Sequence, residues 1–159
     1  MATDWHSLVR FQSNEMLKIV FEDTDCLQQA IDKTTGLRWT KKNGNLIVTD
    51  RRLIFPSYKE TKGLLSKTRS WTDVLLDTAY EKIGTLQLYT GQENHPDLEN
   101  YRRRALYTVL REHANVDERQ RYFVFGLPNE DKAKFALNTI WQAKYRSDGE
   151  LLEKISKEE

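Results

Sequence analysis

The sequence predicts a mainly β fold, a seven-stranded antiparallel bent barrel capped by a C-terminal α-helix. About seven short runs rich in apolar and β-branched residues follow one another between residues 16 and 125, with turn residues between them. After Phe125 the apolar residues change to a helical spacing. Because no helices alternate with the strands, a parallel doubly wound sheet is excluded and antiparallel order is favoured.

The length and composition favour a single domain. A chain of 159 residues fits one core, and its 38% hydrophobic content separates it from disordered chains. We expect one domain over residues 1–146 and a polar tail over residues 147–159. The chain does not open with a secretory signal pattern, and no uncharged run approaches the roughly 20 residues that cross a bilayer. A cytoplasmic protein without a transmembrane segment is expected.

The first half of the chain predicts four short strands. Residues 16–21 form an apolar, partly β-branched run that ends at an acidic stretch. Residues 37–41 and 45–49 flank Asn43-Gly44, which is typical of a type I′ hairpin turn. A tight connection at residues 50–52 leads into a strand over residues 53–55, and Pro56 limits how far that strand pairs.

The second half predicts an exposed loop, four strands and a helix. The basic and polar residues 57–70 surround a small apolar tip, Gly63-Leu64-Leu65, which suits an exposed loop. Strands are expected over residues 71–76, 83–89, 105–110 and 122–125, with a loop over 90–100 and another around 113–118. The spacing of Leu106, Val109 and Leu110 also suits a helix that begins near Pro96, although a strand is favoured.

The C-terminal helix has a clear start and a clear apolar stripe. Asn129 is a suitable N-cap, and Glu130 and Asp131 favour the positive end of a helix dipole. The helix is expected to end near Arg146, before Ser147-Asp148-Gly149. Five residues fall at i, i+3, i+4, i+7 and i+8 and form one face: Ala133, Ala136, Leu137, Ile140 and Trp141.

One run of the sequence resembles a known superfamily. The run Gly44-Asn-Leu-Ile-Val-Thr-Asp-Arg-Arg-Leu-Ile-Phe55 is similar to the strand-turn-strand core of GRAM-type domains in the pleckstrin-homology-like (PH-like) superfamily. In that pattern Leu46 and Val48 point to one face, and Leu53 and Phe55 return the apolar side of the next strand. The resemblance covers residues 14–146 and implies a PH-like barrel capped by a helix.

A narrower resemblance is to the GLUE domain of an ESCRT-II vacuolar sorting subunit. Trp5, the run Asn14-Glu-Met-Leu-Lys-Ile19 and the block at residues 44–49 keep a similar order from the start of the chain. This resemblance implies an adaptor for phosphoinositide membranes and, as an added expectation, ubiquitin binding in ESCRT-dependent sorting and protein transport. It aligns no ubiquitin contact with a residue of this chain.

The sequence does not contain the motifs of an enzyme. It has no Gly-x-Ser-x-Gly elbow, no Walker loop and no Gly-rich dinucleotide fingerprint. His6, His95 and His113 are scattered, and Cys26, the single cysteine, has no basic neighbour that would activate it. We therefore expect no catalytic residue, no metal site, no cofactor and no nucleic-acid partner.

The four tryptophans are interpreted as packing residues. Trp39, Trp71 and Trp141 fall within expected strands or the helix, where a core position is more common than a ligand-stacking one. Trp5 precedes the expected core and is predicted to pack back onto it.

The charge distribution points to an anionic partner. Residues 36–72 hold nine basic side chains and two acids, a net charge of +7 (9 − 2), while the whole chain carries +1. A solvated face is the plainer interpretation. Lysine and arginine side chains gathered at the ends of strands also bind phosphate well. The predicted lipid-binding residues are Lys41 and Lys42, placed at one hairpin tip, and Lys59, Lys62, Lys67 and Arg69, placed in the following loop.

Two functions therefore compete at the level of sequence. The leading hypothesis is a non-enzymatic adaptor, peripheral to membranes, that binds anionic phospholipid, specifically a phosphoinositide, through its basic loops. The alternative is a PH-like protein–protein interaction domain without lipid binding. Its candidate surface is the C-terminal helix, where Phe135 lies opposite the apolar stripe and is expected to be exposed, together with the tail over residues 150–159.

Overall fold

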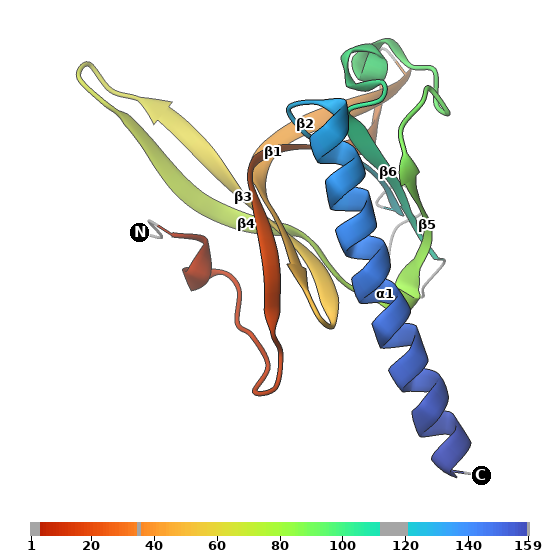
Figure 1. Cartoon of the computed structure of the whole chain (residues 1–159). Helices are drawn as coiled ribbons and strands as arrows, with labels where there is room; N and C mark the ends of the chain where they lie inside the picture. Colours follow the sequence, from red (N-terminus) through yellow and green to blue (C-terminus); the bar gives the residue numbers. More distant parts are fainter. Residues whose placement is uncertain (1–3, 35, 112–120, 159) are drawn as a thin grey trace.

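Seven antiparallel strands and a long C-terminal helix make up the structure over the residues that can be described (Figure 1). The computed structural model describes residues 4–34, 36–111 and 121–158. The strand order across the sheet is β4-β3-β2-β1-β7-β6-β5. The predicted fold class is confirmed, although the sheet bends without closing, because β4 and β5 remain at its two edges. The strands are β1 (Leu17–Asp32), β2 (Gly36–Thr49), β3 (Arg52–Lys62), β4 (Lys67–Ala79), β5 (Ile83–Leu88), β6 (Ala105–Leu110) and β7 (Tyr122–Gly126).

Strand β1 is much longer than the predicted strand over residues 16–21. It continues through the acidic stretch to Asp32, with an irregularity between Phe21 and Thr24 where Asp23 adopts a φ of 50°. The continuation is stabilised from both sides, because β1 pairs with β2 along one edge and with β7 along the other. Long-range pairing of this kind overrides local strand propensity. β1 therefore joins the two halves of the bent sheet.

The predicted turn at Asn43-Gly44 is wrong. Residues 36–49 form the single continuous strand β2, and Gly44 does not have a positive φ. The glycine serves a close approach of β3 instead. A Cβ atom at this position would overlap the carbonyl oxygen of Pro56 and lie 2.7 Å from Cε1 of Phe55. Gly44 thus lets β3 press against β2, which is a known use of glycine within a strand.

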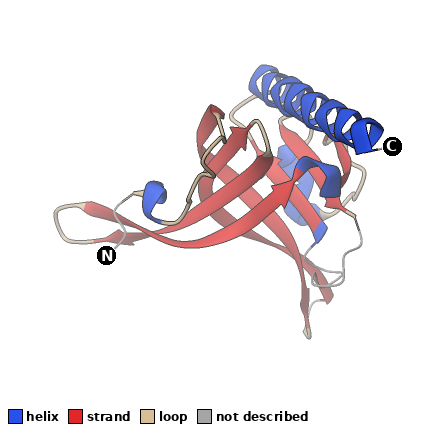
Figure 2. Ribbon diagram, turned by 90° about the horizontal axis from the view of Figure 1, so that it is seen from below, coloured by secondary structure: helices blue, strands red, loops and turns tan. Residues whose placement is uncertain are grey.

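The predicted loop over residues 57–70 is also wrong, because both of its sides continue as strands. β3 and β4 stay paired out to Lys62 opposite Lys67, and only residues 63–66 form the turn. Figure 2 shows this two-stranded extension projecting away from the rest of the sheet, on the side opposite α1. The tight connection at residues 50–51 and the strand over residues 105–110, rather than a helix, are both confirmed.

The remaining connections agree with expectation in part. The expected loop over residues 90–100 contains the short 3-10 helix η3 (Pro96–Tyr101), and two further 3-10 helices are η1 (Trp5–Ser7) and η2 (Tyr80–Lys82). The expected loop around residues 113–118, with His113, lies outside the described residues.

Both faces of the β2–β3 pair are buried, each by a different part of the chain. Leu46, Val48, Leu53 and Phe55 share one face, as predicted, and pack in the main core beneath the C-terminal helix. Ile47, Ile54 and Tyr58 lie on the opposite face, next to Trp71 of β4, and the N-terminal segment covers this face with Trp5 and Val9. The predicted return of Trp5 onto the domain is confirmed, as is the burial of Trp39 and Trp71.

Helix α1 (Glu130–Glu158) begins as predicted and ends later than predicted. Asn129 Oδ1 accepts a hydrogen bond from the amide of Lys132 at 2.9 Å, which is an N-cap contact. Ala133, Ala136 and Ile140 are fully buried, but Trp141 is 39% exposed, so its predicted core position is wrong. The helix continues through Ser147-Asp148-Gly149 because strong helix formers follow and no proline intervenes. The domain boundary at residue 146 remains a prediction.

A charged cluster fixes the N-terminal segment to the sheet. The Glu15 carboxylate is covered from solvent and accepts hydrogen bonds from Arg52 Nε at 2.8 Å and from Thr49 Oγ1 at 2.8 Å. Burial raises the pKa of Glu15, but the bonds from Arg52, the Gln12 amide and Thr49 outweigh it, and the pKa is lowered overall. Arg52 also donates to Asp77 and to the carbonyl of Arg10.

Replacing Gly44 by valine is expected to destabilise the fold by about 2–4 kcal/mol, because the new side chain meets backbone atoms that cannot move without separating β3 from β2. Chemical denaturation followed by circular dichroism measures the change. Gly149→Ala is the matched control: it adds a Cβ with no neighbour within 4 Å, in a helix, and is expected to stabilise by up to about 1 kcal/mol. Equal stability of Gly44→Val and the parent protein would contradict the assigned close approach.

Replacing Glu15 by glutamine is expected to cost about 2 kcal/mol at pH 7, because Arg52 loses a covered anionic partner. Because the pKa of Glu15 is lower in the folded state than its ordinary value of 4.5, the ionised carboxylate stabilises the fold above that value. This stabilisation is lost as the pH falls through the folded-state pKa. The parent protein should therefore lose its advantage over Glu15→Gln between about pH 5 and pH 3. Denaturation curves across this pH range measure the difference in unfolding free energy between the two proteins, with Glu81→Gln, at an exposed carboxylate, as the control. A difference that does not change with pH would contradict the role given to the ionised Glu15.

Candidate functional site

The extension formed by residues 58–71 of β3 and β4, called the arm below, presents two distinct faces. Residues paired directly across antiparallel strands share a face. Tyr58 pairs with Trp71, Glu60 with Arg69, and Lys62 with Lys67, so these six side chains lie on one face. Lys59 pairs with Ser70 and lies on the other face. The direct pairing of Lys62 with Lys67 sets two like charges opposite each other, which is unfavourable unless an anion lies between them.

The tip of the arm is apolar and fully exposed. The amide of Gly63 donates to the carbonyl of Ser66 at 2.8 Å, which closes a turn with Leu64 and Leu65 at its centre. These two leucines are 105% and 100% exposed. Glycine, asparagine, aspartate, proline and serine are the usual residues of such turns. Two leucines at this position contribute nothing to the turn and present apolar surface to whatever the arm meets.

The base of the arm is braced by a cluster around Asp23. Arg69 lies 2.8 Å from Asp23 Oδ1 and 4.4 Å from the centre of the Tyr58 ring, and the Tyr58 hydroxyl donates to Asp23 at 3.0 Å. Tyr58 also meets Trp71 edge-on at 5.0 Å. Burial, together with the hydrogen bond to Asp23, raises the pKa of Tyr58 to about 12. Arg69 therefore pairs within the fold at the base of the arm, and its predicted part in lipid binding stays a prediction.

The other predicted lysines fall into two groups. Lys59, Lys62 and Lys67 are exposed along the arm, as their place near the Leu64-Leu65 tip suggested. Lys41 and Lys42 are exposed but are not at a hairpin tip. They lie within β2, opposite Leu27 and Cys26 of β1, beyond the point at which β2 and β3 separate. The structure does not bring them to the tip of the arm, and their part in lipid binding stays a prediction.

Several arginines of the basic region are used to hold the fold together. Arg38 donates to both carboxylate oxygens of Asp97, at 2.9 and 3.3 Å, and so ties the start of β2 to η3. The amide of Trp39 and the Arg38 guanidinium lower the pKa of Asp97. Arg51 donates to Gln12, and Arg52 to Glu15. Within residues 4–34, 36–111 and 121–158, the five lysines of the basic region make no ion pair. The sequence alone could not distinguish the arginines that hold the fold together from the exposed lysines.

Helix α1 presents aromatic side chains on its outer side. Phe135 is 55% exposed, as predicted, and contacts Phe21 of β1 edge-on with ring centroids 6.0 Å apart. Trp141 and Tyr145 are 39% and 74% exposed, with centroids 6.3 Å apart. They follow each other at i, i+4 and so share one face of the helix. The exposed aromatic surface is larger than the single residue that the sequence indicated.

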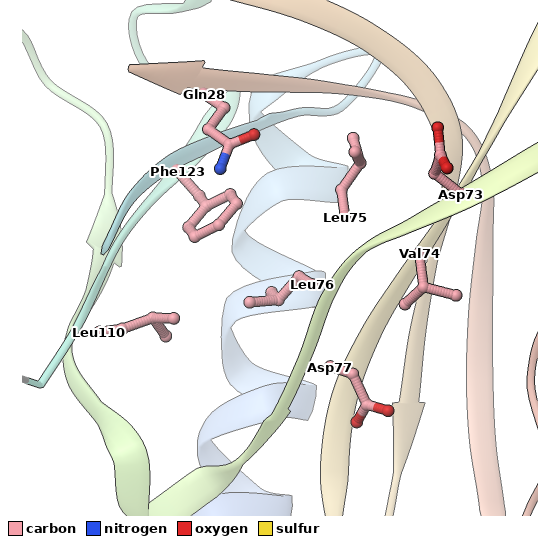
Figure 3. A pocket seen from close by; sticks show the side chains of 8 residues that line it. All are labelled: Gln28, Asp73, Val74, Leu75, Leu76, Asp77, Leu110 and Phe123. Carbon is pink, nitrogen blue, oxygen red and sulfur yellow. The ribbon is translucent and has the colours of Figure 1, made fainter. Parts of the chain in front are cut away.

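A pocket lies between β4 and the β1–β7–β6 side of the bent sheet. It has a volume of about 430 Å³ and is bordered by β4 on one side and by β1, β6 and β7 on the other. Figure 3 shows Leu76 pointing toward Phe123 and Leu110, with Gln28 next to Phe123. Asp73 and Asp77 lie along β4, farther from Phe123 than Leu76 is, and Asp77 points to the other side of the strand. The charged groups that line it are two carboxylates, Asp73 and Asp77. A phosphate group is therefore not expected here, since like charges repel.

Cys26 is buried, and both ring nitrogens of His95 have hydrogen-bond partners. Cys26 is fully buried in the main core, and burial raises the pKa of its thiol far above the usual range. His95 Nδ1 accepts from the Asp97 amide, while its Nε2 lies 2.8 Å from the Leu37 carbonyl. Over the described ranges no group of three or more metal-binding side chains is found. Nor does any helix in those ranges combine the length and apolar character needed to span a membrane.

Comparison with known proteins gives fold similarity at low identity. No family model matches the chain, and no curated protein does. The Ran-binding domain of Nup2 from Ashbya gossypii aligns at 13% identity and a TM-score of 0.48, over 85% of this chain and 99% of that one. The Slm1 PH domain aligns at 12% and 0.41, over 80% and 97%. The C-terminal domain of an unknown protein from Leishmania infantum aligns at 16% and 0.39, over 87% and 91%. Similarities this distant do not assign a ligand.

Proposed function

We propose that this protein is a non-enzymatic PH-like binding module that attaches to anionic membranes through the arm. The observation that carries the proposal is the Leu64-Leu65 turn at the end of a basic two-stranded projection. An apolar tip enters the boundary between headgroups and acyl chains, while lysines next to it pair with lipid phosphates. Lys59, Lys62 and Lys67 stand at the right place for this, within a few residues of the tip.

The expected affinity is modest and reversible. Each lysine near an anionic leaflet contributes about 1 kcal/mol. Burying a leucine side chain contributes about 1.5–3 kcal/mol, and the tip enters only part of the way. Three lysines and two leucines together give on the order of 5–7 kcal/mol, which corresponds to a Kd of roughly 10–200 µM. Such a module concentrates a protein at a membrane rather than anchoring it there.

The lipid, the cellular role and a further partner can be proposed more specifically. The resemblance of residues 44–55 to GRAM and GLUE domains supports a phosphoinositide as the lipid and an adaptor role in ESCRT-dependent sorting, with ubiquitin as a further partner. The acidic pocket is a poor phosphate site, so a phosphoinositide headgroup would meet the outer surface of the arm. Lys41 and Lys42, which lie on β2 away from the tip of the arm, remain predicted lipid contacts.

A second candidate function is protein recognition without lipid. The exposed Phe135 on one side of α1, and the Trp141–Tyr145 pair on another, favour it, because aromatic residues are enriched in protein interfaces. This candidate takes first place if the protein ignores anionic vesicles at low salt.

Reversing the three arm lysines together, Lys59→Glu, Lys62→Glu and Lys67→Glu, is expected to weaken binding to vesicles containing phosphatidylserine and phosphoinositide by 100-fold or more. Arg69 is left in place because it braces the fold. The control exchanges three exposed lysines elsewhere, Lys18→Glu, Lys82→Glu and Lys132→Glu, and so has the same net charge. Sedimentation with vesicles at about 0.05 M salt compares them. Equal loss in both variants would mean that net charge, not the arm, governs binding.

Replacing both tip leucines, Leu64→Ser and Leu65→Ser, is expected to weaken vesicle binding by about 30-fold or more, with melting unchanged because the tip is fully exposed. Insertion is measured directly with an environment-sensitive dye on a Leu65→Cys variant, since the native Cys26 is buried and should not react. The dye emission should shift to the blue on anionic vesicles. An emission that stays at its value in water while the protein sediments with the vesicles would show that the tip does not insert.

A further inference from the structure

The pocket at the open side of the sheet combines three features that the arm does not use. Its first feature is an open strand edge. β4 is the last strand of the sheet order and, among the residues that the structure describes, pairs only with β3. The pocket is lined by five consecutive residues of β4 from Asp73 to Asp77. Five residues of strand span roughly 16 Å, so a ligand that follows this wall is elongated.

The second feature is a local distortion that turns side chains toward the pocket. The pairing of β4 with β3 jumps from Leu76 opposite Phe55 to Val74 opposite Pro56, which leaves Leu75 as an extra residue. A second jump leaves Thr72 extra. Bulges of this kind bend a strand and re-aim its side chains, and they are common beside binding sites. Here both Leu75 and Leu76 line the pocket (Figure 3).

The third feature is the contrast between floor and rim. Leu76, Leu110 and Phe123 supply an apolar floor, while Asp73 and Asp77 supply negative charge on the β4 side. Asp77 is already paired with Arg52 Nη1 at 2.8 Å. Asp73 is exposed, and it makes no ion pair with any residue of the part of the chain that the structure describes. Gln28 adds an amide at the opposite wall.

We propose that this pocket binds a lysine or arginine side chain presented on an extended segment of another protein. The aliphatic stem of such a side chain packs on Leu76 and Phe123, and its cationic head pairs with Asp73. Long basic side chains divide in this way between apolar and polar surroundings. The segment that carries the side chain runs along the free edge of β4, as in other cases of strand addition. The volume of about 430 Å³ lies within the usual range of ligand pockets.

The proposal concerns a surface other than the tip of the arm and stands independently of membrane binding. The probe is the capped peptide acetyl-Val-Lys-Val-Lys-Val-amide, compared with the same peptide carrying norleucine in place of lysine, and with n-butylammonium as a free amine. The ¹⁵N-labelled full chain is titrated and the amide chemical shifts are followed. The expected Kd is on the order of 0.1–1 mM, since one charged contact and a partly buried stem are gained.

Shifts confined to residues 73–77, Leu110 and Phe123 are the expected result. Asp73→Asn should weaken the lysine peptide at least 5-fold and leave the weak norleucine peptide unchanged, whereas Glu81→Gln, an exposed carboxylate outside the pocket, should change neither. Equal effects of the two substitutions, or equal binding of both peptides, would contradict the proposal that the pocket binds a basic side chain. If n-butylammonium bound as tightly as the peptide, the edge of β4 would contribute nothing to the affinity. That result would contradict the proposal that the ligand is a protein segment.

Discussion

The close approach of β3 to β2 at Gly44 is the constraint on which the rest of the structure depends. With no Cβ at this position, the Pro56 backbone and the Phe55 ring come within distances that no other residue would permit. The β2–β3 pairing continues to Asn43 opposite Tyr58 and goes no further. Beyond that point β2 stays with β1 and curves toward η3, while β3 stays with β4 and forms the arm (Figure 1). Gly44 therefore allows the last close contact before β2 and β3 separate.

This division separates regions of opposite chemistry. The arm carries lysines and two exposed leucines, and its base is braced by Asp23, Tyr58 and Arg69. The pocket beside the same strand, a few residues closer to the core, is lined by carboxylates and apolar side chains. Anions are favoured at the first region and cations at the second, since the sign of the nearby charge decides which ion is stabilised. A single edge strand, β4, contributes to both.

The N-terminal segment stabilises the fold by covering the second face of the β2–β3 pair. Ile47 and Ile54 would be exposed if the N-terminal segment did not return with Trp5 and Val9. That return is held by polar contacts, chiefly those of Glu15 with Arg52 and Thr49. The N-terminal residues thus belong to the folded unit, and α1 and the N-terminal segment cover opposite sides of the β2–β3 pair.

The sequence by itself determined the approximate number of strands, the antiparallel order, the capped start of α1 and the inward residues of the β2–β3 pair, because these follow from local periodicity and capping preferences. The exposed Leu64-Leu65 tip and the exposed Phe135 were also predictable from the pattern around them. Only the tertiary structure decided that Gly44 allows close packing and not a turn, that β1 runs through its acidic stretch, and that Arg38, Arg52 and Arg69 are structural while neighbouring lysines are exposed. The pocket had no signal in the sequence, since Gln28, Asp73, Leu110 and Phe123 meet through pairing of distant strands. Such contacts depend on which strands lie side by side, and local residue preferences do not encode that.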